Sequence, residues 1–171
     1  LLAPDVCAAV YAPEEAQVQA SSVVQAFALA AQRAGANIFP HQEISRLQTQ
    51  NEKVIAVYTS QGEEIACNQL IIASGAWAAQ CGAWLNVSLP IRPLQGQLLA
   101  LPQTSLQLKH IVFGEGAYLT PRGNTILVGA TKEEMGFDLK VTQQGTSWLY
   151  ATATRLIPRL SESKIQATWA G

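Results

Sequence analysis

The sequence has few residues of the kinds that bind metals or build disulfide frameworks. Of its 171 residues, three are cysteine and two are histidine. Cys7, Cys67 and Cys81 show no C-x-x-C spacing, and His41 and His110 have no acidic or thiol neighbours at ligand spacing. A disulfide framework and a metal site are therefore not predicted, and free thiols fit a reducing cytoplasm.

The sequence also lacks an excess of one charge and a long apolar run. Its formal net charge is -1, and the eleven Lys and Arg residues are scattered, so nucleic acid is not an expected partner. No apolar run approaches the roughly 20 residues that span a bilayer, and the opening LLAPDVCAAVYA has no charged signal-peptide region. With 49% hydrophobic and 13% charged residues, a globular cytoplasmic protein without membrane contact is expected.

Two motifs are absent, and each absence bears on function. The sequence has no G-x-S-x-G and no defensible Ser-His-Asp arrangement, so nucleophilic hydrolysis is not predicted. No G-x-G-x-x-G precedes the apolar run LIIASG at residues 70–75, although that loop usually accompanies such a run in nucleotide-binding domains. The chain also begins without methionine, and we expect it to be an internal piece of a larger protein.

Helical spacing appears first near residue 21. Ser21 or Ser22 can cap this helix, and Gly35 can end it. Residues 37–39 then suggest a short strand, which would make half of a βαβ unit. The apolar positions with three-to-four spacing are Val23, Val24, Phe27, Ala30, Ala31 and Ala34.

Four β-prone segments follow this helix. Residues 44–49, 54–59 and 64–67 are separated by turn-forming residues and predict a three-stranded meander. Residues 69–73 are continuously apolar, as in a parallel strand covered on both faces, and they end at Ser74-Gly75. A short helix is expected over 76–86.

A second group of strands follows without intervening helices, so an antiparallel sheet is predicted. Thr142 can cap a final helix over 143–157, which Pro158 follows. Two bodies result, an α/β layer over 17–86 and an antiparallel sheet with a backing helix over 87–165 together with 1–16. The predicted strands of the second group are 94–101, 111–113, 118–121, 125–131 and 165–169.

Several motifs in order carry a resemblance to a known family. IRPLQGQ, YLTPR, LVGAT and TWAG occur jointly after LIIASGAWAAQCG. In this order they resemble the middle of the D-amino-acid-oxidase-like flavoenzymes, in particular the glycine oxidases of bacterial thiamine biosynthesis. The resemblance implies an α/β (α+β) fold with a partial FAD-binding Rossmann-like layer over 17–86 and a substrate-binding sheet. Residues 166–171 would return toward the FAD domain.

The resemblance also implies roles for particular residues. Ile44 would meet the adenine end of FAD with its backbone, and the segment holding Ala73, Ser74, Gly75 and Trp77 would pass close to the cofactor. The alternatives are an ordinary core position for Ile44 and a simple strand end for Gly75.

Two further positions match the substrate side in the family. Tyr118 would donate a hydrogen bond from its hydroxyl to the substrate carboxylate. The alternative is an ordinary strand tyrosine with a half-buried ring. Lys132 would border the substrate pocket, where the family often has an apolar residue, or it is a solvated cation beside Glu133 and Glu134. Arg122 lies next to a hairpin turn and is read as a surface residue. No catalytic residue is assigned.

The resemblance implies an activity for the parent protein. It would oxidise glycine, sarcosine or a small D-amino acid through FAD, giving an imine, then a 2-oxo acid, with dioxygen as acceptor and hydrogen peroxide as product. Without the phosphate loop and the arginine that the family has after WAG, the isolated chain is expected neither to retain FAD nor to turn over glycine. A dehydrogenase, a non-catalytic binding or assembly module, and a homo-oligomer associating through exposed sheet edges stay open.

Overall fold

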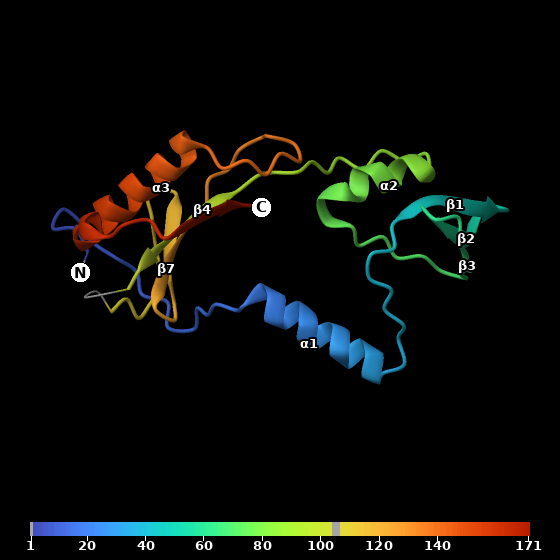
Figure 1. Ribbon diagram of the computed structural model, residues 1–171, viewed down its shortest axis with the longest axis horizontal. Coiled ribbons are helices and arrows are strands. Elements are labelled where there is room, and N and C mark those ends of the chain that lie inside the picture. The colour runs from blue at the N-terminus through green and yellow to red at the C-terminus, as the bar shows by residue number, and fades with distance from the viewer. Residues whose placement is uncertain (1, 104–106) are drawn as a thin grey trace. The chain divides into compact units, whose positions relative to one another are not determined.

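The computed structural model describes residues 2–103 and 107–171, which divide into two compact units (Figure 1). Within the described ranges, no helix is both long enough and apolar enough to cross a membrane. The segments of unit 1 are Leu1–Ala9, Ser74–Ala79 and Leu89–Gly171, and those of unit 2 are Val10–Ala73 and Gln80–Ser88.

Unit 2 begins with the helix that the apolar spacing predicts. Helix α1 spans Ala20–Arg33, and Gly35 adopts a φ of 94°, the left-handed conformation that commonly ends a helix. The N-cap is Gln19 rather than one of the two serines, because the helix starts before them, and no side chain caps it. None of the residues of α1 is buried.

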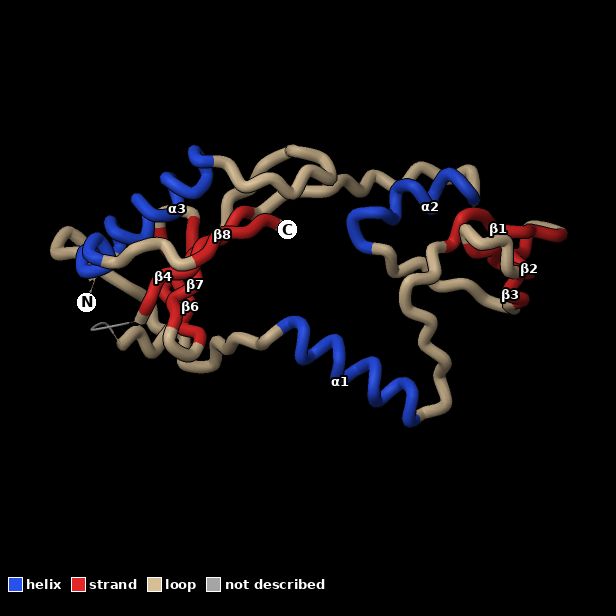
Figure 2. The backbone as a smooth tube through the Cα atoms, in the orientation of Figure 1, coloured by secondary structure: helices blue, strands red, loops and turns tan. Residues whose placement is uncertain are grey.

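The three-stranded meander is confirmed. Strands β1 (Ile44–Gln50), β2 (Lys53–Thr59) and β3 (Glu64–Ala66) pair in the order β1-β2-β3, and both pairs are antiparallel (Figure 2). Asn51 and Glu52 have φ values of 49° and 60°, which a tight turn between β1 and β2 requires. The turn chemistry of the sequence thus determines where the meander reverses.

A polar cluster lies on β2 around Tyr58. Its hydroxyl lies 2.6 Å from both Gln48 Oε1 and Glu64 Oε2, and the guanidinium carbon of Arg46 lies 3.3 Å from the ring centroid. The hydrogen bond to the Glu64 carboxylate raises the pKa of Tyr58 above its ordinary value, and desolvation adds to this, whereas Arg46 opposes it. The folded meander therefore holds the proton of this phenol more tightly than the unfolded chain.

We expect the high-pH side of the stability profile to report this cluster. Because the folded pKa of Tyr58 is raised, its contribution to stability is present below the ordinary value of 10.0 and is lost as the pH rises through the folded pKa. A phenolate absorbance titration of wild type and Tyr58→Phe should identify one late-titrating tyrosine. Glu64→Gln should move that titration to lower pH, and an unchanged midpoint in Glu64→Gln would contradict this account.

Two strands of the sequence prediction are wrong. Residues 37–39 and 69–73 form no strand, and Ile71 is 88% exposed. A strand requires ladder hydrogen bonds to a neighbour, and no strand of the described residues pairs with either segment. Apolar composition alone therefore does not produce a strand here. The predicted short helix does form, as the 3-10 turn η1 (Gly75–Trp77) followed by α2 (Ala78–Trp84).

Unit 1 contains a five-stranded sheet. Its strands are ordered β5-β6-β7-β4-β8, and every pair is antiparallel, as predicted from the absence of intervening helices. In β7 the burial alternates, with Ile126 and Val128 buried and Leu127 between them half-buried, so one face lies beneath a helix while the other stays accessible. The strands are β4 (Gln97–Pro102), β5 (Val112–Gly114), β6 (Ala117–Arg122), β7 (Thr125–Gly129) and β8 (Ala167–Ala170).

Helix α3 (Gln143–Leu156) packs on one face of this sheet (Figure 1). Thr142 caps it as predicted, with its side chain accepting a hydrogen bond from Gly145 N at 3.1 Å. After α3, Pro158 begins the 3-10 helix η2 (Pro158–Glu162). The fully buried residues of the core between helix and sheet include Leu99, Leu101, Leu119, Ile126, Val128, Leu149, Ala153 and Ile157.

Candidate functional site

A row of side chains crosses the sheet on the face opposite α3. Tyr118 pairs directly with Gly129, Gly129 with Leu98, and Leu98 with Trp169. Phe113 on β5 pairs with Tyr118 and extends the row. Directly opposed residues of antiparallel strands point to the same face, and the neighbouring row is the one buried against α3. This face therefore presents an aromatic and apolar surface around one phenol.

Gly129 makes room for the ring of Tyr118. A Cβ added at Gly129 would lie 2.8 Å from the phenol oxygen and 3.0 Å from both Cζ of Tyr118 and Cδ2 of Leu98. The ring thus lies across the bare backbone of β7, and Tyr118 is half-buried. In the described part of the chain, no hydrogen bond uses its hydroxyl. The contact with Gly129 thus fixes the position of the hydroxyl, and its unused hydrogen-bonding capacity is available to a ligand.

The segment after β7 is attached to the start of β4. Gln95 and Glu133 exchange two backbone hydrogen bonds of 2.9 and 3.0 Å. Gln97 N donates to Thr131 Oγ1 at 2.9 Å, and Thr131 N donates to Gln97 O at 3.3 Å. Lys132 lies between these two anchored residues, so its backbone position is determined from both sides.

Gln97 is the centre of a buried polar cluster. The residue has no exposed surface, and its Nε2 donates to Glu133 Oε1 at 2.7 Å and to Thr142 Oγ1 at 3.0 Å. Its Oε1 accepts from Thr142 N at 2.8 Å. One amide thus joins β4, the segment after β7 and the first residue before α3. Gly145 lies against it, since a Cβ there would come within 2.5 Å of Gln97 Nε2.

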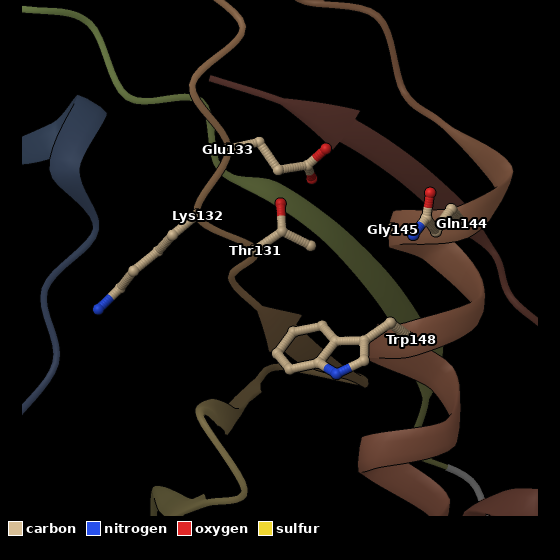
Figure 3. Close-up of a pocket in the computed structure, with 6 residues that line it drawn as sticks. All are labelled: Thr131, Lys132, Glu133, Gln144, Gly145 and Trp148. Atoms are coloured by element: carbon tan, nitrogen blue, oxygen red, sulfur yellow. The ribbon is translucent and has the colours of Figure 1, made fainter.

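A cavity of about 310 Å³ lies beside this cluster, lined by Thr131, Lys132, Glu133, Gln144, Gly145 and Trp148 (Figure 3). Figure 3 shows the Glu133 carboxylate on the side of Gln144 and Gly145, whereas the Lys132 side chain extends away from Trp148 and α3. The side chains of Glu133 and Lys132 therefore point to different sides of the segment.

The segment Ser74–Ala79 is also part of unit 1. Gly75 has a φ of 54° and no atom within 4 Å of an added Cβ, so its backbone is open to a ligand. Trp77 N donates to Ser74 O at 3.0 Å. The Trp77 ring stacks on Phe137 with 5.1 Å between ring centroids and 23° between planes. This stack ties the turn at Gly75 to the loop that follows Lys132.

The residues predicted for the site fall in both units. Ser74, Gly75, Trp77, Tyr118 and Lys132 lie in unit 1. Ile44, a half-buried residue of β1, and the exposed Ala73 lie in unit 2. Their roles toward a cofactor or substrate stay predictions.

Sequence reasoning missed the two glutamines and Gly129. Gln95 and Gln97 alternate in the motif LQGQ, so they could have been read as two side chains on one side of an extended segment. Gly129 ends the apolar run TILVG, and a glycine inside a strand often marks a close approach by another group.

The comparison with known families covers the complete chain. The model of the family described as DAO, FAD dependent oxidoreductase, matches residues 1–171. The chain belongs to this DAO family. FAD is therefore the cofactor to be considered, and the mixed helical and antiparallel fold expected from the sequence is confirmed by solved structures of FAD-dependent oxidases.

Individual DAO relatives agree with this placement. A glycine oxidase of Geobacillus kaustophilus (strain HTA426) is 32% identical over 100% of this chain and 45% of its own length. The crystal structure of glycine oxidase from Geobacillus kaustophilus has a TM-score of 0.81 at 32% identity, covering 91% of this chain and 42% of that one. The structure of L-proline dehydrogenase from P. horikoshii has a TM-score of 0.82 at 25% identity, covering 88% and 42%. The chain thus spans less than half the length of each of these three matched proteins.

The described residues fit a role beside FAD in this DAO domain. Ala73 and Ser74 have small side chains, and a Cβ added at Gly75 would meet no atom within 4 Å, so Gly75 tolerates close approach. Trp77 adds an aromatic surface that is 56% exposed. These features are those expected of a segment that passes along a bound cofactor.

Proposed function

We propose that the full-length protein is an FAD-dependent amino acid oxidase that acts on a small primary or secondary amino acid. The observation that carries this proposal is the DAO family match over residues 1–171, with 32% identity to a glycine oxidase over the complete chain. When bound, FAD would supply the hydride acceptor for the substrate Cα and the route of both electrons to dioxygen, so that the products are hydrogen peroxide and an imine that water converts to a 2-oxo acid and ammonia or an amine.

The residues of this chain would bind and orient the substrate. Tyr118 would donate a hydrogen bond from its hydroxyl to the substrate carboxylate, because its ring lies over Gly129 on the face opposite α3 and no hydrogen bond among the described residues uses this hydroxyl. A rigid ring loses little entropy on binding and so positions the substrate Cα efficiently. Leu98 and Trp169 of the same row would exclude water from the substrate's apolar side. On the cofactor side, Ile44, Ala73, Ser74, Gly75 and Trp77 are proposed to contact FAD.

The activity is tested with purified full-length protein supplied with FAD. Glycine, sarcosine, D-alanine and D-proline should be screened for oxygen consumption, with peroxide and 2-oxo acid as products. Turnover of an amino acid with peroxide release is the expected result. If no amino acid is turned over, whether the electron acceptor is dioxygen or an artificial one, the proposal is contradicted and a binding or assembly module is favoured.

A second candidate function is an amino acid dehydrogenase. The structural likeness to L-proline dehydrogenase, at a TM-score of 0.82, supports keeping it. The two functions differ only in the electron acceptor, so turnover with a redox dye and without oxygen consumption would identify the dehydrogenase. The isolated chain is proposed to be inactive in either case, because it spans only 45% of the glycine oxidase relative. Peroxide release by residues 1–171 with added FAD would refute that.

Tyr118→Phe should weaken substrate binding without disturbing the sheet. Phenylalanine fills the same space over Gly129 but removes a charge-assisted hydrogen bond to a carboxylate, so kcat/KM should fall about 10- to 100-fold, mainly through KM. Tyr150→Phe is the matched control, because the Tyr150 hydroxyl bonds to Ser161 O and Ser163 O, both at 3.0 Å, beside α3. Steady-state kinetics of both variants decide the matter, and equal KM values for Tyr118→Phe and wild type would remove Tyr118 from the site.

A further inference from the structure

We propose that Lys132 selects substrates that carry a second anionic group, so that the preferred substrate class is an amino dicarboxylate rather than glycine itself. This inference rests on the proposed amino acid oxidase function. It is carried by three observations: the fixed backbone around Lys132, the engagement of both neighbouring carboxylates by other residues, and the side to which its ammonium group extends.

The backbone on both sides of Lys132 is anchored to the first residue of β4 and to the segment that precedes this strand. Thr131 is joined to Gln97 through its hydroxyl and its N–H, and Glu133 is joined to Gln95 by two backbone hydrogen bonds. The fully buried Gln97 side chain adds a bond to the Glu133 carboxylate. A specificity residue requires such a fixed base, because a freely moving one would lose its discrimination to conformational entropy.

The two carboxylates that follow Lys132 in the sequence are engaged by other residues. Glu133 accepts a 2.7 Å hydrogen bond from Gln97 Nε2, and Glu134 forms a 2.7 Å ion pair with Arg92. Among the described residues, no ion pair involves Lys132. Lys132 is exposed, as the alternative of a solvated cation also predicts, but neither acid neutralises it, so its positive charge remains for a ligand.

Lys132 extends from the same side of the sheet as Tyr118. Figure 3 shows its side chain directed away from α3, and the register places Tyr118 on the face opposite that helix. Lys132 follows Gly129 by three residues, so the Cα atoms of Lys132 and Gly129 lie within about 11 Å, and Gly129 is the cross-strand partner of Tyr118. A substrate with one carboxylate on Tyr118 can thus present a second anionic group to the flexible Lys132 ammonium.

The test compares substrates in full-length protein with FAD. Wild type, Lys132→Met, Lys132→Arg and the exposed control Lys164→Met are assayed with neutral glycine and D-alanine and with D-aspartate, D-glutamate and iminodiacetate. Lys132→Met should lower kcat/KM for the dicarboxylates about 10- to 100-fold and leave that for neutral amino acids nearly unchanged. Lys132→Arg should retain the preference, which should weaken at high salt because an exposed charge pair is screened.

Binding is measured separately from turnover. Calorimetric titration with succinate, a dicarboxylate that lacks an amine and cannot be oxidised at Cα, should show weaker binding to Lys132→Met than to wild type and Lys164→Met. A substrate ratio that is unchanged in Lys132→Met, or an equal loss for neutral and acidic substrates, would overturn the proposal while leaving the oxidase function standing. If the wild-type protein oxidises none of the amino acids, the proposed function is contradicted instead. The succinate titration would still decide whether Lys132 binds a dicarboxylate.

Discussion

Gly145→Ala should destabilise unit 1 by about 2–4 kcal/mol, because the new methyl group would enter the space of the Gln97 amide. The added Cβ would lie 2.5 to 2.7 Å from the nitrogen, carbon and oxygen of that amide. Gln97 has no exposed surface and holds Glu133 and Thr142 by hydrogen bonds, so it cannot move without breaking them. Urea denaturation of the full-length protein, followed by tryptophan fluorescence, measures the change.

The sign of this effect separates packing from helix propensity. Within a helix, alanine is favoured over glycine by about 1 kcal/mol, so propensity alone predicts a more stable protein. Ser147→Ala, an exposed change on the same helix, should follow propensity and serves as the control. In a Gln97→Ala background the cost of Gly145→Ala should largely disappear, and a cost that persists there would show that the clash is not with Gln97.

Leu149→Ala should lower the free energy of unfolding of unit 1 by about 2–5 kcal/mol. Leu149 has no exposed surface and packs in the core between α3 and the five-stranded sheet. Truncation removes buried methyl groups and leaves a cavity that the sheet cannot close without bending. The same urea denaturation experiment reports the change.

Leu29→Ala is the control for this cavity prediction. Leu29 lies on α1 and is 55% exposed, so its truncation should change the stability by no more than about 0.5 kcal/mol. Comparable losses for Leu29→Ala and Leu149→Ala would show that α1 is buried against other parts of the full-length protein.

The elements that the sequence predicted well are those specified by neighbouring residues. The Thr142 cap, the end of α1 at Gly35 and the tight turn at Asn51 and Glu52 each depend on side chains within a few positions. The expected strand over 69–73 failed for the opposite reason, because its hydrogen-bond partners must come from distant segments. The DAO assignment stands despite that error, since the matched residues span the complete chain.

By itself, the sequence determined the family, the meander, the antiparallel sheet with its backing helix, and the candidates Tyr118 and Lys132. Only the tertiary structure decided that Gly129 lies under the Tyr118 ring and that Gln97 binds residues 34 to 45 positions away. It also decided that both acids beside Lys132 are engaged elsewhere. The reason is physical: periodicity and caps arise from contacts along the chain, whereas the surroundings of a side chain arise from segments that only folding brings together.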